Sequence, residues 1–272
     1  FLNLKPESQR TNRNVMEKIR QRLGDAQVAS FLPRHLEAMM AEKADKPDAA
    51  NRIRRMMKLL MRYAVRHGYR NEDPTSQIRK LKTRSQGYKT WGEEEIERFY
   101  AAHGEGTRAR LAFDILLYTG LRRADVVKLG RQHLRDGVLT VMMSKTGQTV
   151  SIPVHPVLRR SLDRLPPDQL TFLITDQGKP FTANGFGNWI GDLVRQAGLR
   201  EGLEKGEKGF SSHGLRKAIC RRLADVGCDA LQIMAITGHS DIEQVMVYIA
   251  ERDRRRAADL AIRSLSAYGS SD

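Results

Sequence analysis

Cysteines, clusters of acidic residues and long apolar runs are all scarce in this sequence. The two cysteines, Cys220 and Cys228, have neither the partners nor the spacing of a zinc site, so we expect two packing thiols in a reducing compartment. No group of Asp and Glu residues suggests a two-metal nuclease. No stretch approaches the roughly 18 apolar residues of a membrane span, and no secretion signal opens the chain. We therefore expect a cytoplasmic protein that makes no contact with a membrane.

Basic residues, by contrast, are abundant. The 272 residues include 47 Lys and Arg against 32 Asp and Glu, a net charge of +15, and 40% of them are hydrophobic. Residues 1–90 hold 21 basic and 9 acidic side chains, a net +12, whereas residues 91–272 hold 26 and 23, a net +3. The length allows one or two domains with their own cores, and the positive charge is concentrated in the N-terminal third. The chain begins at Phe1 without a methionine, which leaves open an upstream module.

Three helices are predicted in the N-terminal third, over residues 14–23, 33–43 and 49–68. The third combines apolar residues and arginines at helical spacing, which indicates an amphipathic helix with a basic outer face. That face is either simply solvated or binds a polyanion. Residues 71–74 end the helix, and the polar, basic segment 78–90 is predicted to be an extended interdomain linker that can lie along a polyanion.

The rest of the chain is predicted to be mainly helical with one small hairpin. Thr90 to Glu93 has the spacing of a capping box at the start of this region. Two β-rich runs, 138–143 and 149–154, flank a turn that carries Lys145. Helices are expected over 93–103, 107–119, 123–129, 156–164, 182–198, 212–226, 229–237, 241–250 and 254–266. The expected fold class is mainly α with a small antiparallel β-sheet (α+β).

Five short motifs follow one another in this second region. They are Thr119-Gly120-Leu121-Arg122, Ser144-Lys145-Thr146-Gly147, His213-Gly214-Leu215-Arg216, Gly238-His239 and, nine residues on, Tyr248. In this order they resemble the active-site motifs of the tyrosine recombinase (phage integrase) family, and Asp125 falls where the first motif usually has an acidic residue. The basic region before residue 85 is similar to the family's core-binding domain, so the resemblance covers essentially the whole chain.

These residue types also suit attack on a DNA phosphodiester. The attack loads negative charge onto the nonbridging oxygens, which the planar guanidinium forks of Arg122 and Arg216 could bind. His213 and Arg216, at i and i+3, share a helix face and could point at one phosphate, although a solvated His and Arg pair is the commoner arrangement. His239 is expected to donate a hydrogen bond to a nonbridging oxygen.

Tyr248 is the predicted nucleophile. A tyrosine hydroxyl has an unperturbed pKa of ~10, so it needs nearby cations and a proton acceptor, for which His213 is the better candidate. Tyr248 lies in the apolar run 245–249, which also fits a place in the core. Tyr63, Tyr100 and Tyr118 lie in apolar helical patterns and are expected in the core.

The leaving 5′-oxygen needs a proton as well. Lys145, on a mobile hairpin, could be the general acid, although an exposed loop lysine is the commonest fate of this residue type. Asp125 is expected to orient the catalytic groups and not to bind a metal. We expect neither a metal nor another cofactor, because the arginines supply the positive charge that metal ions supply in other phosphodiester-cleaving enzymes.

The resemblance implies a site-specific recombinase or integrase that works on double-stranded DNA at the nucleoid. It implies a helical (SAM-like) core-binding domain over 1–85, a linker over 86–90, and a catalytic domain over 91–272 with a C-terminal tail helix. Cleavage by Tyr248 would give a 3′-phosphotyrosine and a free 5′-hydroxyl without ATP, and strand exchange would pass through a Holliday junction in a homotetramer on DNA. Free in solution, the protein would be a monomer or a weak oligomer. The candidate DNA-binding residues are Arg52, Arg55, Arg62, Lys80, Lys82 and Arg84.

The segment after Tyr248 has a helical apolar stripe. Apolar residues recur at spacings of three and four over 257–265, after the basic run 252–256. Such a stripe is buried either on its own domain or, as is usual in the family, on a neighbouring protomer.

Two other functions compete with recombination. A type IB topoisomerase uses a similar set of groups but relaxes DNA as a monomer, and the small size and separate helical domain favour the recombinase. A non-catalytic regulator is the second, because residues 229–248 also fit a helix-turn-helix with Gly238 in the turn. The regulator would leave Arg122, His213 and Tyr248 unexplained.

Overall fold

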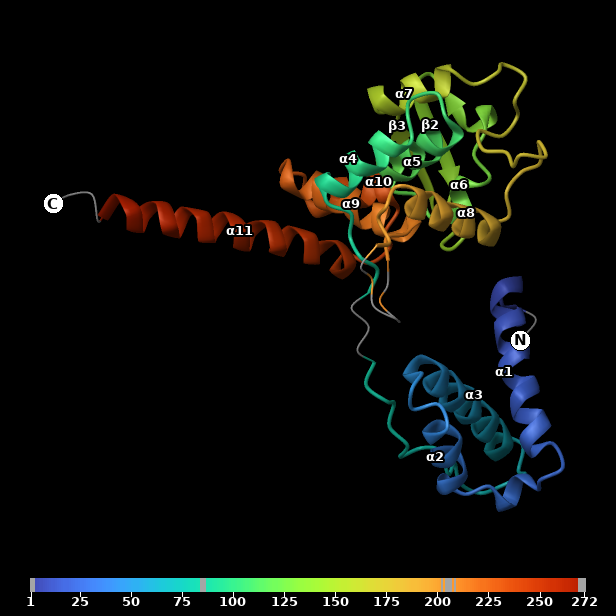
Figure 1. Cartoon of the computed structure of the whole chain (residues 1–272). Coiled ribbons are helices and arrows are strands. Elements are labelled where there is room, and N and C mark those ends of the chain that lie inside the picture. Colours follow the sequence, from blue (N-terminus) through green and yellow to red (C-terminus); the bar gives the residue numbers. More distant parts are fainter. Residues whose placement is uncertain (1–2, 84–86, 202, 204–206, 208, 269–272) are drawn as a thin grey trace. The chain divides into compact units, whose positions relative to one another are not determined.

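The computed structural model describes residues 3–83, 87–201, 203, 207 and 209–268, and it forms two compact units. Unit 1 is Phe1–Ser85 and unit 2 is Gln86–Asp272. The chain is mostly helical with one small antiparallel sheet, which confirms the predicted α+β class (Figure 1). None of the described helices is both long enough and apolar enough to cross a membrane.

Unit 1 is built from three helices around a core rich in methionine. They are α1 (Pro6–Leu23), α2 (Pro33–Ala41) and α3 (Pro47–Arg66), and each begins with proline, which is favoured in the first turn because it has no N–H to leave unbonded. Leu36, Met39, Met40, Met57 and Met61 form the centre of the core. The prediction for the first helix was eight residues too short, because its exposed first turns have no apolar period.

The beginning of the predicted linker belongs to unit 1. Ile78 is buried in the core of this unit, and Leu81 packs against the same core. The Asn51 amide group donates to the Leu81 carbonyl and accepts from the Leu81 N–H, both at 2.9 Å, and Arg54 Nε donates to the Ile78 carbonyl at 2.6 Å. The prediction of a free linker from residue 78 was therefore wrong, because α3 binds the backbone of this segment.

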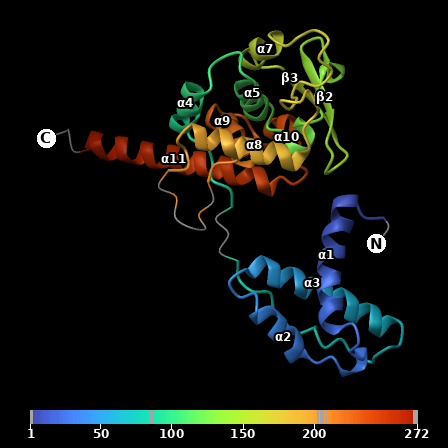
Figure 2. The ribbon, with the colours of Figure 1, turned by 45° about the vertical axis from the view of Figure 1, so that its right-hand side comes forward.

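Unit 2 combines eight helices with a three-stranded sheet in the described part of the chain (Figures 1 and 2). The strands β1 (Leu134–Arg135), β2 (Val138–Met142) and β3 (Thr149–Pro153) are antiparallel in the order β1-β2-β3, and Met142 pairs with Thr149 at the hairpin end. The predicted hairpin is confirmed. The helices are α4 (Glu93–Ala102), α5 (Arg108–Thr119), α6 (Arg123–Val126), α7 (Pro156–Asp163), α8 (Ala183–Gln196), α9 (Ser212–Asp225), α10 (Ala230–Thr237) and α11 (Glu243–Tyr268).

Helix α5 is buried along most of its length and fixes the centre of unit 2. Trp91 packs edge-on against Phe99 and Phe113, which join α4 to α5. The fully buried Asp114 accepts hydrogen bonds from Tyr100 at 2.8 Å and from Ser161 at 2.6 Å, which tie α4 and α7 to α5. These contacts hold the C-terminal end of α5, where the first motif begins.

The predicted start of the helix over 93–103 is confirmed by α4, but its predicted cap is wrong. Gly92, and not Thr90, is the residue that precedes the helix, and the Glu95 carboxylate accepts a hydrogen bond from Gly92 N–H at 2.8 Å. Trp91 is buried in the core of unit 2 and precedes the cap, so it is not part of the first turn of the helix.

Helix α11 is one helix of 26 residues, where the sequence predicted two. The basic run that suggested a break consists of good helix formers, and the segment has neither glycine nor proline. In Figures 1 and 2, α11 extends beyond the rest of unit 2, and residues 253–266 are all exposed. The apolar stripe of the tail is therefore not covered by any residue that the structure describes.

Candidate active site

A pocket of about 370 Å³ in unit 2 brings four of the predicted catalytic residues together. Arg122, Lys145, His213 and Arg216 all line it. They come from the loop before α6, the β2–β3 turn and the first turns of α9. The other lining residues are Tyr88, Leu121, Arg123, Ala124, Gly187, Ser211 and Ser212.

Two glycines at helix ends direct the chain into this site. Gly120 follows α5 with φ 61° and Gly238 follows α10 with φ 63°, a left-handed conformation that glycine adopts without strain. A Cβ on Gly120 would lie 2.8 Å from the side chain of Ile219, so the space is closed as well. The turns place Arg122 two residues after Gly120 and His239 directly after Gly238.

The two arginines present buried nitrogens without a protein partner. Arg216 is only 3% exposed, and its Nη1 donates to the carbonyls of Gly120 at 2.6 Å and Thr237 at 2.5 Å. Nη2 of Arg216 and Nη1 of Arg122 are buried and have no hydrogen-bond partner among the described residues. Burial, then the charge of Arg122, lower the pKa of Arg216 to about 10, so it remains charged at neutral pH. An anion in the pocket would satisfy both nitrogens.

Asp125 connects the first motif to the turn that carries Lys145. The carboxylate is buried, and its Oδ1 accepts a hydrogen bond from Ser144 N–H at 2.8 Å. Lys128 Nζ donates to the Ser144 hydroxyl at 3.0 Å. Lys145 is exposed in the next position of the turn. The predicted supporting role of Asp125 therefore has a physical basis, which is to hold this turn against α6.

His213 and His239 are both kept neutral by their surroundings. The ring of His213 packs against that of Tyr88 at an interplanar angle of 52°, with ring centres 4.5 Å apart. His213 is partly accessible, yet desolvation and then the charge of Arg216 lower its pKa. His239 is 9% exposed, and burial, then Arg216 and Arg122, lower its pKa to about 4. A neutral imidazole has one nitrogen that can accept a proton.

Tyr248 lies on α11 and is half-buried in a small cluster with Cys220 and Val245. Burial and the neighbouring Cys220 raise its pKa to about 12, while the charge of Arg216 acts in the opposite direction. Tyr248 and His239 do not line the pocket, but both interact electrostatically with Arg216. The hydroxyl is thus protonated at neutral pH and needs a proton acceptor to become a nucleophile. Cys220 and Cys228 are both free thiols.

The predicted DNA-binding residues lie on the surface of unit 1. Arg52, Arg55 and Arg62 are exposed on one face of α3, and Lys80 and Lys82 are exposed after it. A groove of about 640 Å³ is lined by Arg55, Arg62 and Lys80, among others. Arg84 lies outside the described residues.

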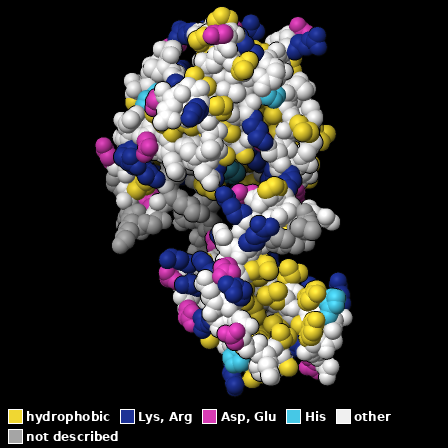
Figure 3. Space-filling model, turned by 90° about the vertical axis from the view of Figure 1, so that its right-hand side faces the viewer, with side chains coloured by type: hydrophobic (Ala, Val, Ile, Leu, Met, Phe, Trp, Pro, Cys, Tyr) yellow, Lys and Arg dark blue, Asp and Glu magenta, His cyan; other side chains and the backbone are white. Residues whose placement is uncertain are grey.

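Exposed apolar side chains accompany these basic residues. Leu59 and Tyr63 share the exposed face of α3, and Tyr63 is 56% exposed, so its predicted place in the core was wrong. Tyr63 follows Arg62 in the sequence and lies on the face of α3 that points away from α1 and α2. Figure 3 shows a face of unit 1 on which hydrophobic side chains gather.

Three residues of the site were missed by the sequence analysis. Tyr88 was placed in a polar linker, yet its ring packs on His213. Ser144 acts through its backbone N–H, and Thr237 through both its hydroxyl and its carbonyl. Only Thr237 had a signal in the sequence, because the pair Thr119-Gly120 ahead of Arg122 recurs as Thr237-Gly238 ahead of His239.

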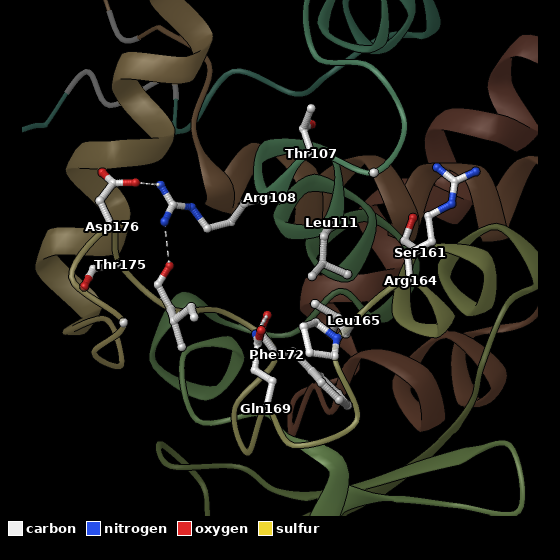
Figure 4. Close-up of a pocket in the computed structure, with 14 residues that line it drawn as sticks. Thr107, Arg108, Leu111, Ser161, Arg164, Leu165, Gln169, Phe172, Thr175 and Asp176 are labelled. Carbon is white, nitrogen blue, oxygen red and sulfur yellow. Dashed lines mark hydrogen bonds and ion pairs between the residues drawn. The ribbon is translucent and has the colours of Figure 1, made fainter.

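A larger pocket of about 550 Å³ elsewhere in unit 2 is lined by none of the predicted catalytic residues (Figure 4). Arg108 crosses it and donates to the carbonyl of Ile174 at 2.9 Å and to Asp176 at 2.5 Å. Arg164, at its edge, pairs with Glu105. Nε of Arg108 is buried without a hydrogen-bond partner among the described residues, but both of its Nη atoms and the Arg164 guanidinium are bonded to protein groups.

Comparison with known proteins gives relatives over most of the chain. Tyrosine recombinase XerD of Ralstonia nicotianae is 26% identical over 243 residues, which cover 83% of this chain and 74% of the relative. A crystal structure of a lambda integrase dimer bound to a COC′ core site has 21% identity and a TM-score of 0.79, over 91% of this chain and 89% of that one. A lambda integrase tetramer bound to a Holliday junction has 21% identity and a TM-score of 0.76, over 88% and 73%.

Two family matches together cover both units. Residues 3–81 match the phage integrase central domain. Residues 89–255, more than half of the chain, match the phage integrase family and contain all six predicted catalytic positions. The chain therefore belongs to the phage integrase family, the family of the tyrosine recombinases.

Proposed function

We propose that this protein is a site-specific DNA recombinase that cleaves and rejoins DNA through a covalent bond to Tyr248. The observation that carries the proposal is the pair of buried, unpartnered nitrogens of Arg122 and Arg216 in one pocket with Lys145 and His213. A phosphodiester with two nonbridging oxygens fits that pair of donors, and the charge that develops on those oxygens during attack strengthens both bonds. Family membership supports the same reaction.

In the proposed reaction, the Tyr248 oxygen forms a bond to phosphorus and the bond from phosphorus to the 5′-oxygen breaks. The tyrosine proton passes to a neutral histidine, for which His213 and His239 are the candidates, and Lys145 protonates the 5′-oxygen. The products are a 3′-phosphotyrosine and a free 5′-hydroxyl. The energy of the broken bond is kept in the new ester, so rejoining by the reverse steps needs no ATP, and we expect no metal or other cofactor.

Double-stranded DNA is the proposed substrate, at the nucleoid in the cytoplasm, and both units bind it. Residues 1–85 would act as the core-binding domain, residues 86–90 as the linker and residues 91–272 as the catalytic domain. The exposed basic face of α3 supports this role for unit 1, because phosphate contacts by Arg and Lys dominate affinity for DNA. The contacts proposed are Arg52, Arg55, Arg62, Lys80, Lys82 and Arg84.

Strand exchange would take place in a homotetramer, through a Holliday junction. The exposed end of α11 supports this assembly, because its apolar side chains Leu260, Ile262 and Leu265 are uncovered in a single chain. Docking of this segment on a neighbouring protomer repeats head to tail and closes as a ring. A monomer or weak oligomer is expected before DNA is bound.

The test combines trapping and exchange. A binding site is first selected from random DNA, and a nicked duplex of that site then loses the short 5′-hydroxyl fragment, so that cleavage cannot be reversed. SDS-stable adducts with this duplex would exclude a regulator that only binds DNA, and exchange of strands between two intact sites would exclude a monomeric topoisomerase. Binding without adducts would contradict the proposal.

A further inference from the structure

Thr237 connects two of the proposed catalytic side chains. It is the last residue of α10, it is fully buried, and only Gly238 separates it from His239. Its hydroxyl oxygen lies 2.7 Å from Nδ1 of His239, and its carbonyl oxygen accepts a hydrogen bond from Arg216 at 2.5 Å. One residue thus holds His239 with its side chain and Arg216 with its backbone.

A further contact decides which atom donates between Thr237 and His239. The Thr237 hydroxyl donates to the carbonyl oxygen of Ile233 at 2.7 Å, and a carbonyl oxygen can only accept. A hydroxyl has a single hydrogen, so none is left for His239. In this arrangement the hydroxyl oxygen accepts from Nδ1 of His239.

We propose that Thr237 is a positioning residue that holds neutral His239 as the tautomer with its hydrogen on Nδ1, so that Nε2 is an acceptor in the free protein. The tautomer of His239 is argued from these contacts alone, and only the role of Thr237 in catalysis rests on the proposed function. It changes the starting state of His239, because a ring with an unprotonated Nε2 cannot donate to a phosphate oxygen before it takes up a proton. The positive neighbours Arg216 and Arg122 favour the neutral ring.

The chain contains a matched control for this threonine. Thr119 is also the last residue of its helix, is fully buried, donates to the carbonyl four residues earlier, and precedes a left-handed glycine. Its oxygen accepts from the backbone N–H of Leu121 at 3.2 Å and contacts no histidine within hydrogen-bond distance among the described residues. Thr119→Val therefore removes the same kind of buried hydroxyl without removing the partner of His239.

The tautomer is read by nitrogen NMR of the free protein labelled with ¹⁵N-histidine, with His239→Gln to assign its signals. At neutral pH we expect a protonated Nδ1 and an unprotonated Nε2 in the wild-type protein, in Thr237→Ser and in Thr119→Val. Thr237→Val removes the acceptor and should shift the ring toward the tautomer protonated on Nε2. A wild-type spectrum with the proton on Nε2, or an unchanged tautomer in Thr237→Val, would overturn the proposal. If Thr237→Val does not fold, the tautomer measured in the wild-type protein decides the proposal by itself.

Cleavage of a trapped DNA substrate gives a second readout. Thr237→Val should slow cleavage by about tenfold or more at unchanged DNA affinity, and Thr237→Ser should restore it, as for other residues that orient a catalytic histidine. Equal cleavage by Thr237→Val and the wild type would overturn the positioning role. If the wild-type protein cleaves no DNA while the tautomer is as expected, the proposed function fails and the assignment of the tautomer remains.

Discussion

The contacts of Arg216 support the proposal that this site receives an anion. A buried guanidinium is stable only when its N–H groups are bonded, and here Nη1 binds two carbonyls while Nη2 has no partner among the described residues. A buried donor left unbonded costs about 1–3 kcal/mol, and Arg122 contributes a second such nitrogen. The fold therefore maintains two unfavourable groups that a phosphate would satisfy.

Replacement of Arg216 by lysine tests this idea at the residue scale. Lysine retains the charge but loses the planar fork that holds the carbonyls of Gly120 and Thr237 and, in the proposed reaction, also binds a phosphate. We expect Arg216→Lys to lower the single-turnover cleavage rate by about 10²-fold or more, with DNA affinity changed much less. Arg222→Lys is the control, because Arg222 lies on the same helix and pairs with Glu93. Equal rates for Arg216→Lys and the wild type would contradict the assignment.

His239 predicts a pH dependence of stability. Its folded-state pKa of about 4 lies below its ordinary value of 6.5, so between these values the unfolded state binds more protons than the folded state. The free energy of unfolding should therefore fall as the pH is lowered from 6.5 toward 4, with a contribution from His239 on the order of 3 kcal/mol at most. Above pH 6.5 the ring is neutral in both states and contributes no further change.

The measurement is urea unfolding of the wild type and His239→Asn, whose amide can replace Nδ1 beside Thr237. Carboxylates titrate in both proteins, so only the difference between the two curves reports on His239. We expect the variant to lose less stability than the wild type between pH 7 and 4.5. Parallel losses would show that His239 is not neutral and buried in the folded protein.

At the scale of the elements, the exposed face of α3 predicts how DNA binding depends on salt. Arg52, Arg55 and Arg62 can each neutralise one phosphate, and every contact contributes about −0.9 to the slope of log affinity against log salt concentration. Replacing all three with alanine should make that slope shallower by up to roughly 2.7.

A second triple variant gives the matched control for α3. Arg159, Arg164 and Arg195 in unit 2 are exposed and paired with Asp163, Glu105 and Asp192. Their replacement by alanine changes the net charge equally but should leave the slope nearly unchanged. Equal slopes for the two triple variants would show that the face of α3 makes no specific contact with phosphates.

Helix α11 divides into an attached part and an exposed part. Arg252 donates to the Ala224 carbonyl at 3.1 Å, Arg255 pairs with Asp225 at 2.5 Å, and Arg256 donates to the Asp225 carbonyl at 3.0 Å. Truncation after Arg256 therefore removes only exposed turns. We expect an unchanged Tm and unchanged binding to one half-site, but weaker cooperativity on two half-sites in a gel shift.

Substitutions in the full-length helix separate the apolar stripe from the length of the tail. Leu260→Gln with Leu265→Gln should reduce cooperativity as the truncation does. Asp259→Asn with Arg263→Gln, which removes an exposed ion pair on the same turns, should not. Full cooperativity after truncation would mean that this segment does not join protomers.

Elements with a strong local pattern were predictable from the sequence. The β-branched runs around Lys145 gave the hairpin, and Gly120 gave the end of α5. The continuity of α11 was not predictable from the sequence, because a run of exposed charged residues fits a helix and a break equally well. The cap at Gly92 and the contacts of residues 78–83 were hidden too, since the burial of Trp91 and Ile78 depends on other segments.

At the scale of the whole molecule, the order of the motifs pointed to a set of residues that partly meet in one pocket, but not to how these residues are held. Arg122, Lys145, His213 and Arg216 meet in one pocket although they come from separate elements. The roles of Tyr88, Ser144 and Thr237 arise from contacts across the fold, through a ring face, a backbone N–H and a hydroxyl. Such contacts have no fixed spacing in a sequence, so only the structure locates them.

The two units also divide the charge of the molecule. Unit 1, residues 1–85, has a net charge of +11 and unit 2, residues 86–272, a net charge of +4, and each unit has its own core. We infer that unit 1 supplies much of the non-specific attraction to DNA, while unit 2 concentrates a few buried charges on one phosphate. This division explains why the exposed face of α3 and the pocket at Arg216 differ so much in burial.

The most direct test of the central claim is to identify the residue that becomes joined to DNA. A nicked duplex of the selected site is incubated with the wild-type protein, the SDS-stable adduct is digested, and the modified peptide is sequenced by mass spectrometry. We predict a 3′-phosphate ester on Tyr248 alone, and no adduct in Tyr248→Phe, which keeps the ring but lacks the oxygen and should bind the duplex as the wild type does. An ester on another residue, or an adduct that persists in Tyr248→Phe, would contradict the account.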